Sequence, residues 1–264
     1  MRRWLLVGGA AATVQMVVFV VVAGALRPGY DSSRNWISQL SLGPGGGLAT
    51  LNLALCGLWV VLGGFGLRHR LGPGWTVRLV LWCGAGLIAV AVVPTDPGIG
   101  YPPDVAEAHT GIGLVHQIIA LALGLAGIGA SALLGRDVRA ARFGYLVAAI
   151  VAASFVVGTV LVLLDAGGVT PGAPSGLFER IALFTGLAWI GGISLALLRP
   201  DGADSDDGVD GADGPDGGAS PRRAAAEPSG QRASIGFFRA RRAGHRLHGR
   251  VLERPAHPPR PVRR

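Results

Sequence analysis

Six long apolar stretches fill the first 200 residues of this 264-residue chain, and no other feature limits its fold as strongly. They lie at about residues 4–26, 48–67, 75–93, 111–134, 143–164 and 177–198. Each has roughly 18–24 residues, which is enough for a helix to cross the ~30 Å hydrocarbon core of a bilayer. A segment in lipid must satisfy its own backbone hydrogen bonds, so each stretch is expected to be helical. The sequence therefore predicts an all-α membrane protein, a six-transmembrane-helix bundle.

The distribution of arginine predicts how this bundle is oriented. If the N-terminus is cytoplasmic, nine arginines of residues 1–200 fall on the inner side and three on the outer side. The inner nine are Arg2, Arg3, Arg68, Arg70, Arg78, Arg136, Arg139, Arg142 and Arg199, and the outer three are Arg27, Arg34 and Arg180. Cytoplasmic loops carry an excess of basic residues. We therefore expect a multi-pass protein of the cell membrane with cytoplasmic N- and C-termini (N-in/C-in).

The first stretch leaves one alternative open. Residues 22–25 end in an A-x-A pattern, and Arg2 and Arg3 precede the apolar run, so a cleaved signal peptide would leave five spans. The run of roughly 19–23 residues is longer than the roughly 7–15 of a signal peptide, which favours six spans.

Composition changes sharply near residue 200. Residues 201–264 begin with an acidic Gly/Asp-rich block and continue with an Arg/Pro-rich block. A segment with so few apolar residues cannot bury enough surface to fold. The sequence therefore predicts two regions, a transmembrane domain at 1–200 and a disordered cytoplasmic tail at 201–264. Because the tail shows no nucleic-acid-binding fold, we expect its arginines to lie near anionic lipid, with no nucleic-acid partner.

Small residues at fourfold spacing predict where helices approach closely. Ala120 and Gly124 mark one such stripe, and Ala188, Gly192 and Ala196 mark another. Packing inside the bundle is the favoured interpretation of both stripes, and a dimer face is the alternative. Two further small residues, Cys56 and Cys83, lie in apolar stretches and are expected to be buried thiols.

The first outer loop, RPGYDSSRNWISQLSLGPGGG, is the densest group of polar and aromatic residues in the first 200. Its charged residues either pair with one another or receive an anionic headgroup, and the alternative is a packed lid over the bundle. Part of it is expected to form an amphipathic turn that begins at Ser32 or Ser33, with Ile37 and Leu40 in the membrane interface.

Asp96 follows the third stretch, and His116 lies about one turn inside the fourth. An ionisable residue below the membrane surface is a functional candidate by default, and a neutral histidine bonded to a helix neighbour is the alternative. Zinc held by Asp96, His109 and His116 is a less favoured hypothesis. Two histidines seven residues apart on a helix stand about 10 Å apart along its axis, so His109 would have to lie on a loop that folds back. We expect no cofactor.

The loop sequence resembles that of a membrane family named domain of unknown function 998 (DUF 998). The resemblance rests on an R/x-P-x-Y loop running into I-S-x-L, which here is Arg27, Pro28, Tyr30, Ile37, Ser38 and Leu40. A second match is PTDP at Pro94–Pro97 followed by a histidine, His116, in the fourth span. The resemblance covers about residues 5–198. It implies six spans and directs attention to the outer face.

Three functions compete. The favoured one is recognition of a lipid or small molecule at an outward-facing polar site, whose candidate residues are Arg27, Tyr30, Asp31, Arg34, Ser38, Asp96 and His116. The second is a structural or assembly subunit that docks on another membrane protein. The third is a metal-dependent lipid hydrolase with Asp96, His109 and His116 as ligands and Ser38 as an accessory group. Membrane lipids are expected partners in all three.

Overall fold

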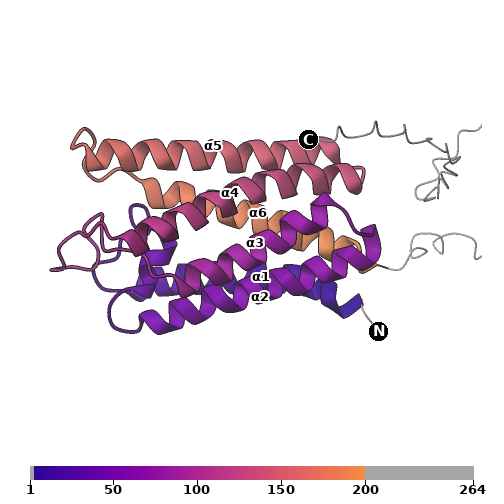
Figure 1. The fold of residues 1–264 in the computed structure, drawn as a ribbon, viewed down its shortest axis with the longest axis horizontal. Helices are drawn as coiled ribbons and strands as arrows, with labels where there is room; N and C mark the ends of the chain where they lie inside the picture. Colours follow the sequence, from indigo (N-terminus) through magenta and orange to yellow (C-terminus); the bar gives the residue numbers. More distant parts are fainter. Residues whose placement is uncertain (1–2, 200–264) are drawn as a thin grey trace, which may run out of the picture. The chain divides into compact units, whose positions relative to one another are not determined.

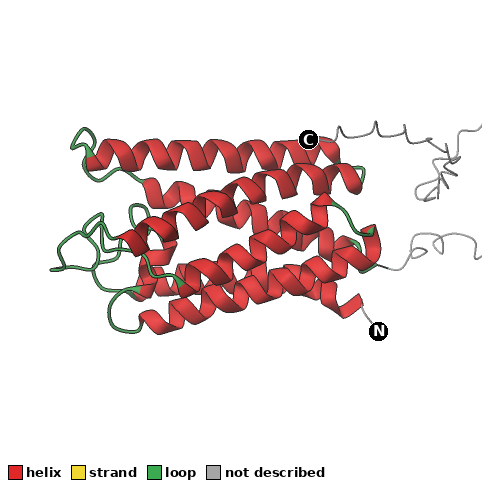
Figure 2. Cartoon of the chain, viewed as in Figure 1, coloured by secondary structure: helices red, strands yellow, loops and turns green. Residues whose placement is uncertain are grey.

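The computed structural model describes residues 3–199, and helices account for most of them (Figures 1 and 2). In chain order the helices are η1 (Arg3–Leu6), α1 (Val7–Leu26), η2 (Ile37–Ser41), α2 (Gly46–Leu71), α3 (Trp75–Val92), α4 (Gly111–Asp137), α5 (Ala141–Ala166) and α6 (Ser175–Ala196). Six helices are long and apolar enough to cross a membrane, which confirms the prediction of an all-α chain with six such segments. The prediction of a disordered tail at 201–264 falls outside the described residues.

The connections between helices distinguish the two ends of the bundle. Residues 27–45, 93–110 and 167–174 connect α1 to α2, α3 to α4 and α5 to α6, and we call this the loop end. Residues 72–74 and 138–140 connect α2 to α3 and α4 to α5 at the other end, which we call the turn end. Such short connections make sequence neighbours antiparallel.

Glycines set the limits of α2. Gly45, at a φ of 76°, turns the chain immediately before the helix, so α2 begins at Gly46 rather than near residue 48. The helix continues past residue 67 to Leu71 and stops at Gly72, whose φ is 81°. Only glycine adopts such values without strain.

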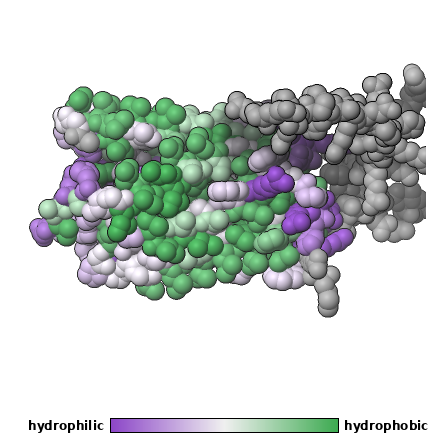
Figure 3. All heavy atoms as spheres, in the orientation of Figure 1, coloured by the Kyte–Doolittle hydropathy of each residue, from purple (hydrophilic) through white to green (hydrophobic). Residues whose placement is uncertain are grey.

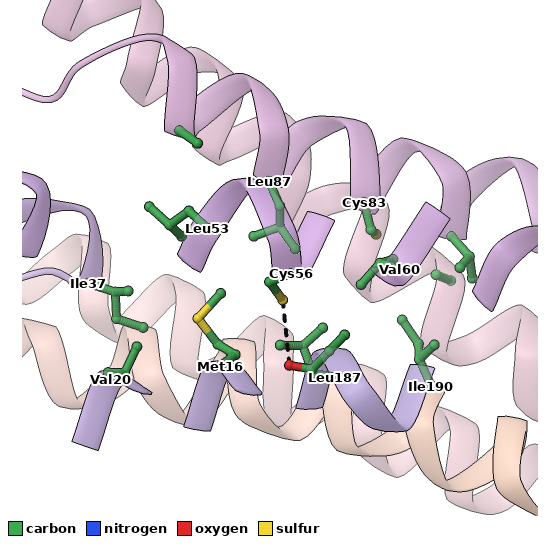
Figure 4. Packing of buried hydrophobic residues seen from close by; sticks show 14 of the residues in the cluster. Met16, Val20, Ile37, Leu53, Cys56, Val60, Cys83, Leu87, Leu187 and Ile190 are labelled. Carbon is green, nitrogen blue, oxygen red and sulfur yellow. Dashed lines mark hydrogen bonds between the residues drawn. The ribbon is translucent and has the colours of Figure 1, made fainter. Parts of the chain in front are cut away.

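The six α-helices form a closed ring. Each packs against its neighbours in the sequence, and α6 also packs against α1. Buried side chains of α1, α2, α3 and α6 form the apolar core (Figure 4). Both cysteines are free and buried there as expected, and Cys56 Sγ lies 3.6 Å from the Ala12 carbonyl oxygen.

Glycine also allows α4 and α5 to touch at the turn end. A Cβ built on Gly135 would lie 2.6 Å from Gly144 Cα, closer than a real side chain can come. Farther from this contact the two helices diverge (Figure 1), and Gly124 of α4 packs against the Phe155 ring. The hairpin is therefore tight at the turn end and open toward the loop end.

The predicted stripe on α4 packs inside the bundle, whereas the favoured interpretation of the α6 stripe, packing inside the bundle, is wrong. Ala188, Gly192 and Ala196 are exposed, and nothing lies within 4 Å of a Cβ built on Gly192. The adjacent Gly191 faces α1 instead, with Thr13 Oγ1 2.7 Å from its built Cβ. The rotation of a helix about its axis selects the packed face, and one residue changes that face by about 100°.

The outside of the bundle is apolar along much of its length. Figure 3 shows hydrophobic side chains covering the visible face between more polar regions near its ends. Exposed large apolar residues occur on all six α-helices, among them Val18, Leu58, Trp82, Leu125, Val156 and Leu195. An apolar surface of this extent is typical of contact with a membrane.

We expect Gly135→Ala to destabilise the protein because its methyl group would collide with the backbone of α5. Overpacking of this kind costs about 1–3 kcal/mol of the free energy of unfolding. The measurement is the thermal midpoint in detergent, with Gly192→Ala as the matched control in open space. Equal midpoints for the two variants would contradict a tight contact at Gly135.

Candidate functional site

The first loop is folded in against the protein through two buried amides. Gln39 Nε2 donates to the Gly98 carbonyl at 2.6 Å, and its Oε1 accepts from the Trp36 N–H at 2.9 Å. Asn35 Nδ2 donates to the Ile99 carbonyl at 3.0 Å. These bonds join the first loop to the second, because a buried amide must find partners.

This packing corrects the expected position of the amphipathic turn. The helical turn is η2, which follows Trp36 and begins at Ile37, not at Ser32 or Ser33. Ile37 and Leu40 are 3% and 0% exposed, so they lie in the protein core rather than in the membrane interface. Because the first loop folds across the ends of the helices, these side chains are buried in the protein core instead of contacting lipid.

Arg180 of α6 holds the first loop from the other side. Its side chain is buried and donates to the carbonyl oxygens of Asn35 at 2.9 Å and Gly176 at 2.8 Å. It also donates to the Tyr30 hydroxyl, which in turn donates to the Trp36 carbonyl at 2.9 Å. A buried guanidinium is stable only when its donors are satisfied in this way.

The Tyr30 ring contacts two other side chains. Its ring stands edge-on to Tyr101 at a centroid distance of 5.2 Å, and the Arg180 guanidinium carbon lies 5.6 Å from its centroid. Burial raises the pKa of the Tyr30 phenol, so this hydroxyl stays protonated and serves as a hydrogen-bonding link.

Two other candidate residues stabilise the loop itself. Arg27 donates to the carbonyl oxygens of Leu40 at 3.2 Å and Leu42 at 3.3 Å, and also to that of Pro44. Asp31 accepts from the Ser33 hydroxyl at 2.6 Å and from the Ser33 N–H at 2.8 Å, and these bonds lower the pKa of its carboxyl. Arg27, Tyr30 and Asp31 thus organise a packed lid.

A cavity of about 1050 Å³ lies beneath this lid. The other four candidate residues, Arg34, Ser38, Asp96 and His116, all line it. Polar residues gather toward the loop end, which we call the mouth, and the deeper wall is apolar. The apolar lining comes mainly from α3 to α6 and includes Leu87, Leu123, Val151, Leu183, Leu187 and Ile190.

Missing side chains enlarge the cavity at two positions in its wall. Nothing lies within 4 Å of a Cβ built on Gly127, and a Cβ on Gly186 meets only Val151 Cγ2, at 4.0 Å. Both glycines line the cavity, on α4 and α6. Larger residues would therefore project into empty space.

The cavity also reaches the side of the bundle. Leu114 and Leu121 of α4 and Leu163 of α5 line it and are 61%, 47% and 66% exposed. By their positions in α4 and α5 these residues lie in the half of the hairpin nearer the loop end, where the two helices diverge in Figure 1. The opening therefore faces the surroundings of the helices as well as the loop end.

Two carboxylates connect the mouth to the lid. Asp165 of α5 lies 3.9 Å from an Arg34 guanidinium nitrogen and accepts from the Gly172 N–H at 3.0 Å. Glu179 of α6 accepts from the Ile37 N–H at 2.7 Å. Neither carboxylate is a candidate from the sequence alone, because no sequence pattern indicates that they meet Arg34 and Ile37.

Asp96 and His116 flank the start of α4. Asp96 accepts from the Thr110 N–H and hydroxyl, each at 2.7 Å, and these bonds lower the pKa of its carboxyl. His116 Nδ1 lies 2.7 Å from the Val93 carbonyl oxygen, so Nδ1 carries a proton, and on a neutral ring Nε2 is then an acceptor. Its side chain is 3% exposed.

The arrangement of these side chains is not that of a metal centre. Within residues 3–199, no group of three or more His, Cys, Asp or Glu side chains is placed to hold a metal ion. Asp96 and His116 are directed to different backbone partners, and His109 is an exposed residue of the mouth.

The model of a family described as "Protein of unknown function (DUF998)" matches residues 10–196. The chain belongs to the DUF998 family. The match covers nearly all of the six-helix ring, including every residue that lines the cavity of this DUF998 protein. The comparisons with curated proteins and with solved structures give no match.

We expect Arg180→Leu to loosen the lid of the DUF998 protein, because the Tyr30 hydroxyl and the Asn35 carbonyl would lose a charged donor. The N–H groups of Gly176 and Leu177, which bond to the carbonyls of Arg34 and Ser33, should exchange with solvent faster. Hydrogen–deuterium exchange measures this, with Arg142→Leu at the turn end as control. Unchanged exchange at both amides would show that Arg180 does not hold the lid.

Proposed function

We propose that this DUF998 protein binds one amphiphilic molecule, a membrane lipid, in the cavity between α3 and α6. The observation that carries the proposal is the division of a single cavity into a polar mouth and an apolar depth. Its volume of about 1050 Å³ is at the upper end of the range of roughly 300–1,000 Å³ typical of small-molecule sites. A headgroup fits the first part, and acyl chains fit the second.

The side opening supports a lipid over a water-soluble ligand. A molecule that arrives from the bilayer can pass between the diverging parts of α4 and α5, past Leu114 and Leu163. Its chains would then remain in apolar surroundings throughout, so the transfer carries little desolvation cost.

We further propose that the loop end faces outward. Eight arginines of residues 3–199 lie at or near the turn end, whereas Arg27, Arg34 and Arg180 lie at the loop end. This asymmetry supports a cytoplasmic turn end. The headgroup would accordingly sit in the outer half of the membrane.

Single cysteines test this orientation, because the native Cys56 and Cys83 are buried. We expect a membrane-impermeant maleimide to label Val105→Cys on intact cells and to leave Gly74→Cys unlabelled until the cells are opened. Both positions are exposed, at opposite ends of the bundle. Labelling of Gly74→Cys alone would reverse the proposed orientation.

Filling the cavity tests lipid binding. We expect native mass spectrometry of the full chain in detergent to show one retained lipid per wild-type chain. Gly186→Leu places a side chain in the cavity and should lower the occupancy at least about ten-fold, which corresponds to about 1.4 kcal/mol of binding free energy.

Gly192→Leu is the matched control, because it adds the same side chain to the exposed face of the same helix. It should retain the lipid. A wild-type chain without lipid, or equal occupancy in the two variants, would overturn the proposed site and favour the alternative of an assembly subunit.

A further inference from the structure

Negatively charged side chains outnumber arginines in the lining of the mouth. Four carboxylates, those of Asp96, Glu107, Asp165 and Glu179, line the cavity together with one guanidinium, that of Arg34. Within residues 3–199, Arg34 and Asp165 form the one ion pair seen at this mouth, and at 3.9 Å it is long. Of the arginines that the structure describes, none other than Arg34 lines the cavity, and Arg180, which lies behind the wall, interacts electrostatically with Glu179.

The hydrogen-bonding capacity of the wall has the same bias. His116 uses Nδ1 to donate to the Val93 carbonyl, and within residues 3–199 no hydrogen bond to Nε2 is found, so on a neutral ring Nε2 is free to accept from a ligand. Ser154 is 6% exposed and lines the cavity, and none of the hydrogen bonds found in the described residues involves its hydroxyl. A ligand can donate to His116 Nε2, and the Ser154 hydroxyl can either accept from it or donate to it.

Glu179 is the carboxylate best placed to meet such a ligand. One of its oxygens accepts from the Ile37 N–H, and within residues 3–199 no hydrogen bond to its second oxygen is found. The adjacent Arg180 is occupied by Tyr30 and by the carbonyls of Asn35 and Gly176. A carboxylate on an apolar helix pays a desolvation cost that a cationic ligand would offset.

Arg34, in contrast, offers a hydrogen-bond donor to an anionic group of a ligand. Its Nε atom is buried and has no hydrogen-bond partner among residues 3–199, although the same side chain contacts Asp165 and lines the cavity. An N–H of a guanidinium pairs well with a phosphate oxygen. The mouth thus offers one site for an anion and several for a hydrogen-bonding cation.

We propose that the cavity selects phospholipids whose headgroup carries a primary ammonium, with the phosphate at Arg34 and the ammonium at Glu179. This inference rests on the proposed lipid-binding function and specifies the class of lipid. A primary ammonium donates three hydrogen bonds and carries the positive charge that the mouth lacks. A trimethylammonium headgroup has the charge without the donors, and a glycerol headgroup has donors without the charge.

The test offers the full-length protein an equal mixture of dioleoyl phosphatidylethanolamine, phosphatidylcholine and phosphatidylglycerol in detergent, and native mass spectrometry counts the bound species. Because the acyl chains are identical, any preference comes from the headgroup. We expect phosphatidylethanolamine to exceed each of the other two by about ten-fold in the wild-type protein.

Glu179→Gln should bring phosphatidylethanolamine and phosphatidylcholine close to parity without lowering total lipid occupancy, since the amide oxygen still accepts from Ile37. Asp104→Asn is the matched control, because Asp104 is an exposed carboxylate of the second loop that does not line the cavity. It should keep the wild-type preference.

The outcomes separate the two proposals. Equal binding of the three lipids, or a preference for phosphatidylglycerol, would overturn the ammonium inference and leave lipid binding intact. Binding of none of them would overturn lipid binding itself. The wild-type comparison needs no variant, so a folding defect in Glu179→Gln would not prevent a decision.

Discussion

The buried guanidinium of Arg180 is the constraint on which the mouth of the cavity depends. Water does not reach it, so its donors must find protein acceptors, and these come from Tyr30, Asn35 and Gly176. The first loop is thereby held against α6, which brings the Ile37 N–H to Glu179 at 2.7 Å. One α6 arginine therefore fixes the lid, and its sequence neighbour becomes part of the wall beneath that lid.

The sequence predicts the six helices because each apolar stretch is long enough to cross a bilayer, and this requires no knowledge of tertiary contacts. It does not predict the role of Arg180, which resembles any other arginine near a helix end until its acceptors are known. The same holds for Asn35 and Gln39, whose burial depends on carbonyls of the second loop. Residues that the sequence suggests as candidates because of their chemical type therefore prove to have different positions in the structure. Some, such as Arg27, stabilise the lid, and others, such as His116, line the cavity.

Small residues illustrate a second limit of prediction. Their spacing identifies a helix face, but the face that packs depends on how neighbouring helices rotate one another. Gly191 rather than Gly192 meets α1, and Gly135 rather than Gly124 meets a partner glycine. The rotation of the helices also contributes to the cavity, because Gly127 and Gly186 present no side chain to its wall.

The two parts of the cavity have different consequences for a bound lipid: the apolar depth affects affinity, and the polar mouth affects selectivity. In the proposed complex, the apolar depth would contact acyl chains, which are alike in many lipids, so this part would contribute binding energy without discrimination. Discrimination is a difference between binding energies, and it must come from groups that only some ligands can satisfy. In the proposed complex those groups lie at the mouth, where Glu179 and His116 Nε2 would accept from the ligand and Arg34 Nε would donate to it. Changes in the depth should therefore alter occupancy for every lipid, whereas changes at the mouth should alter which lipid is bound.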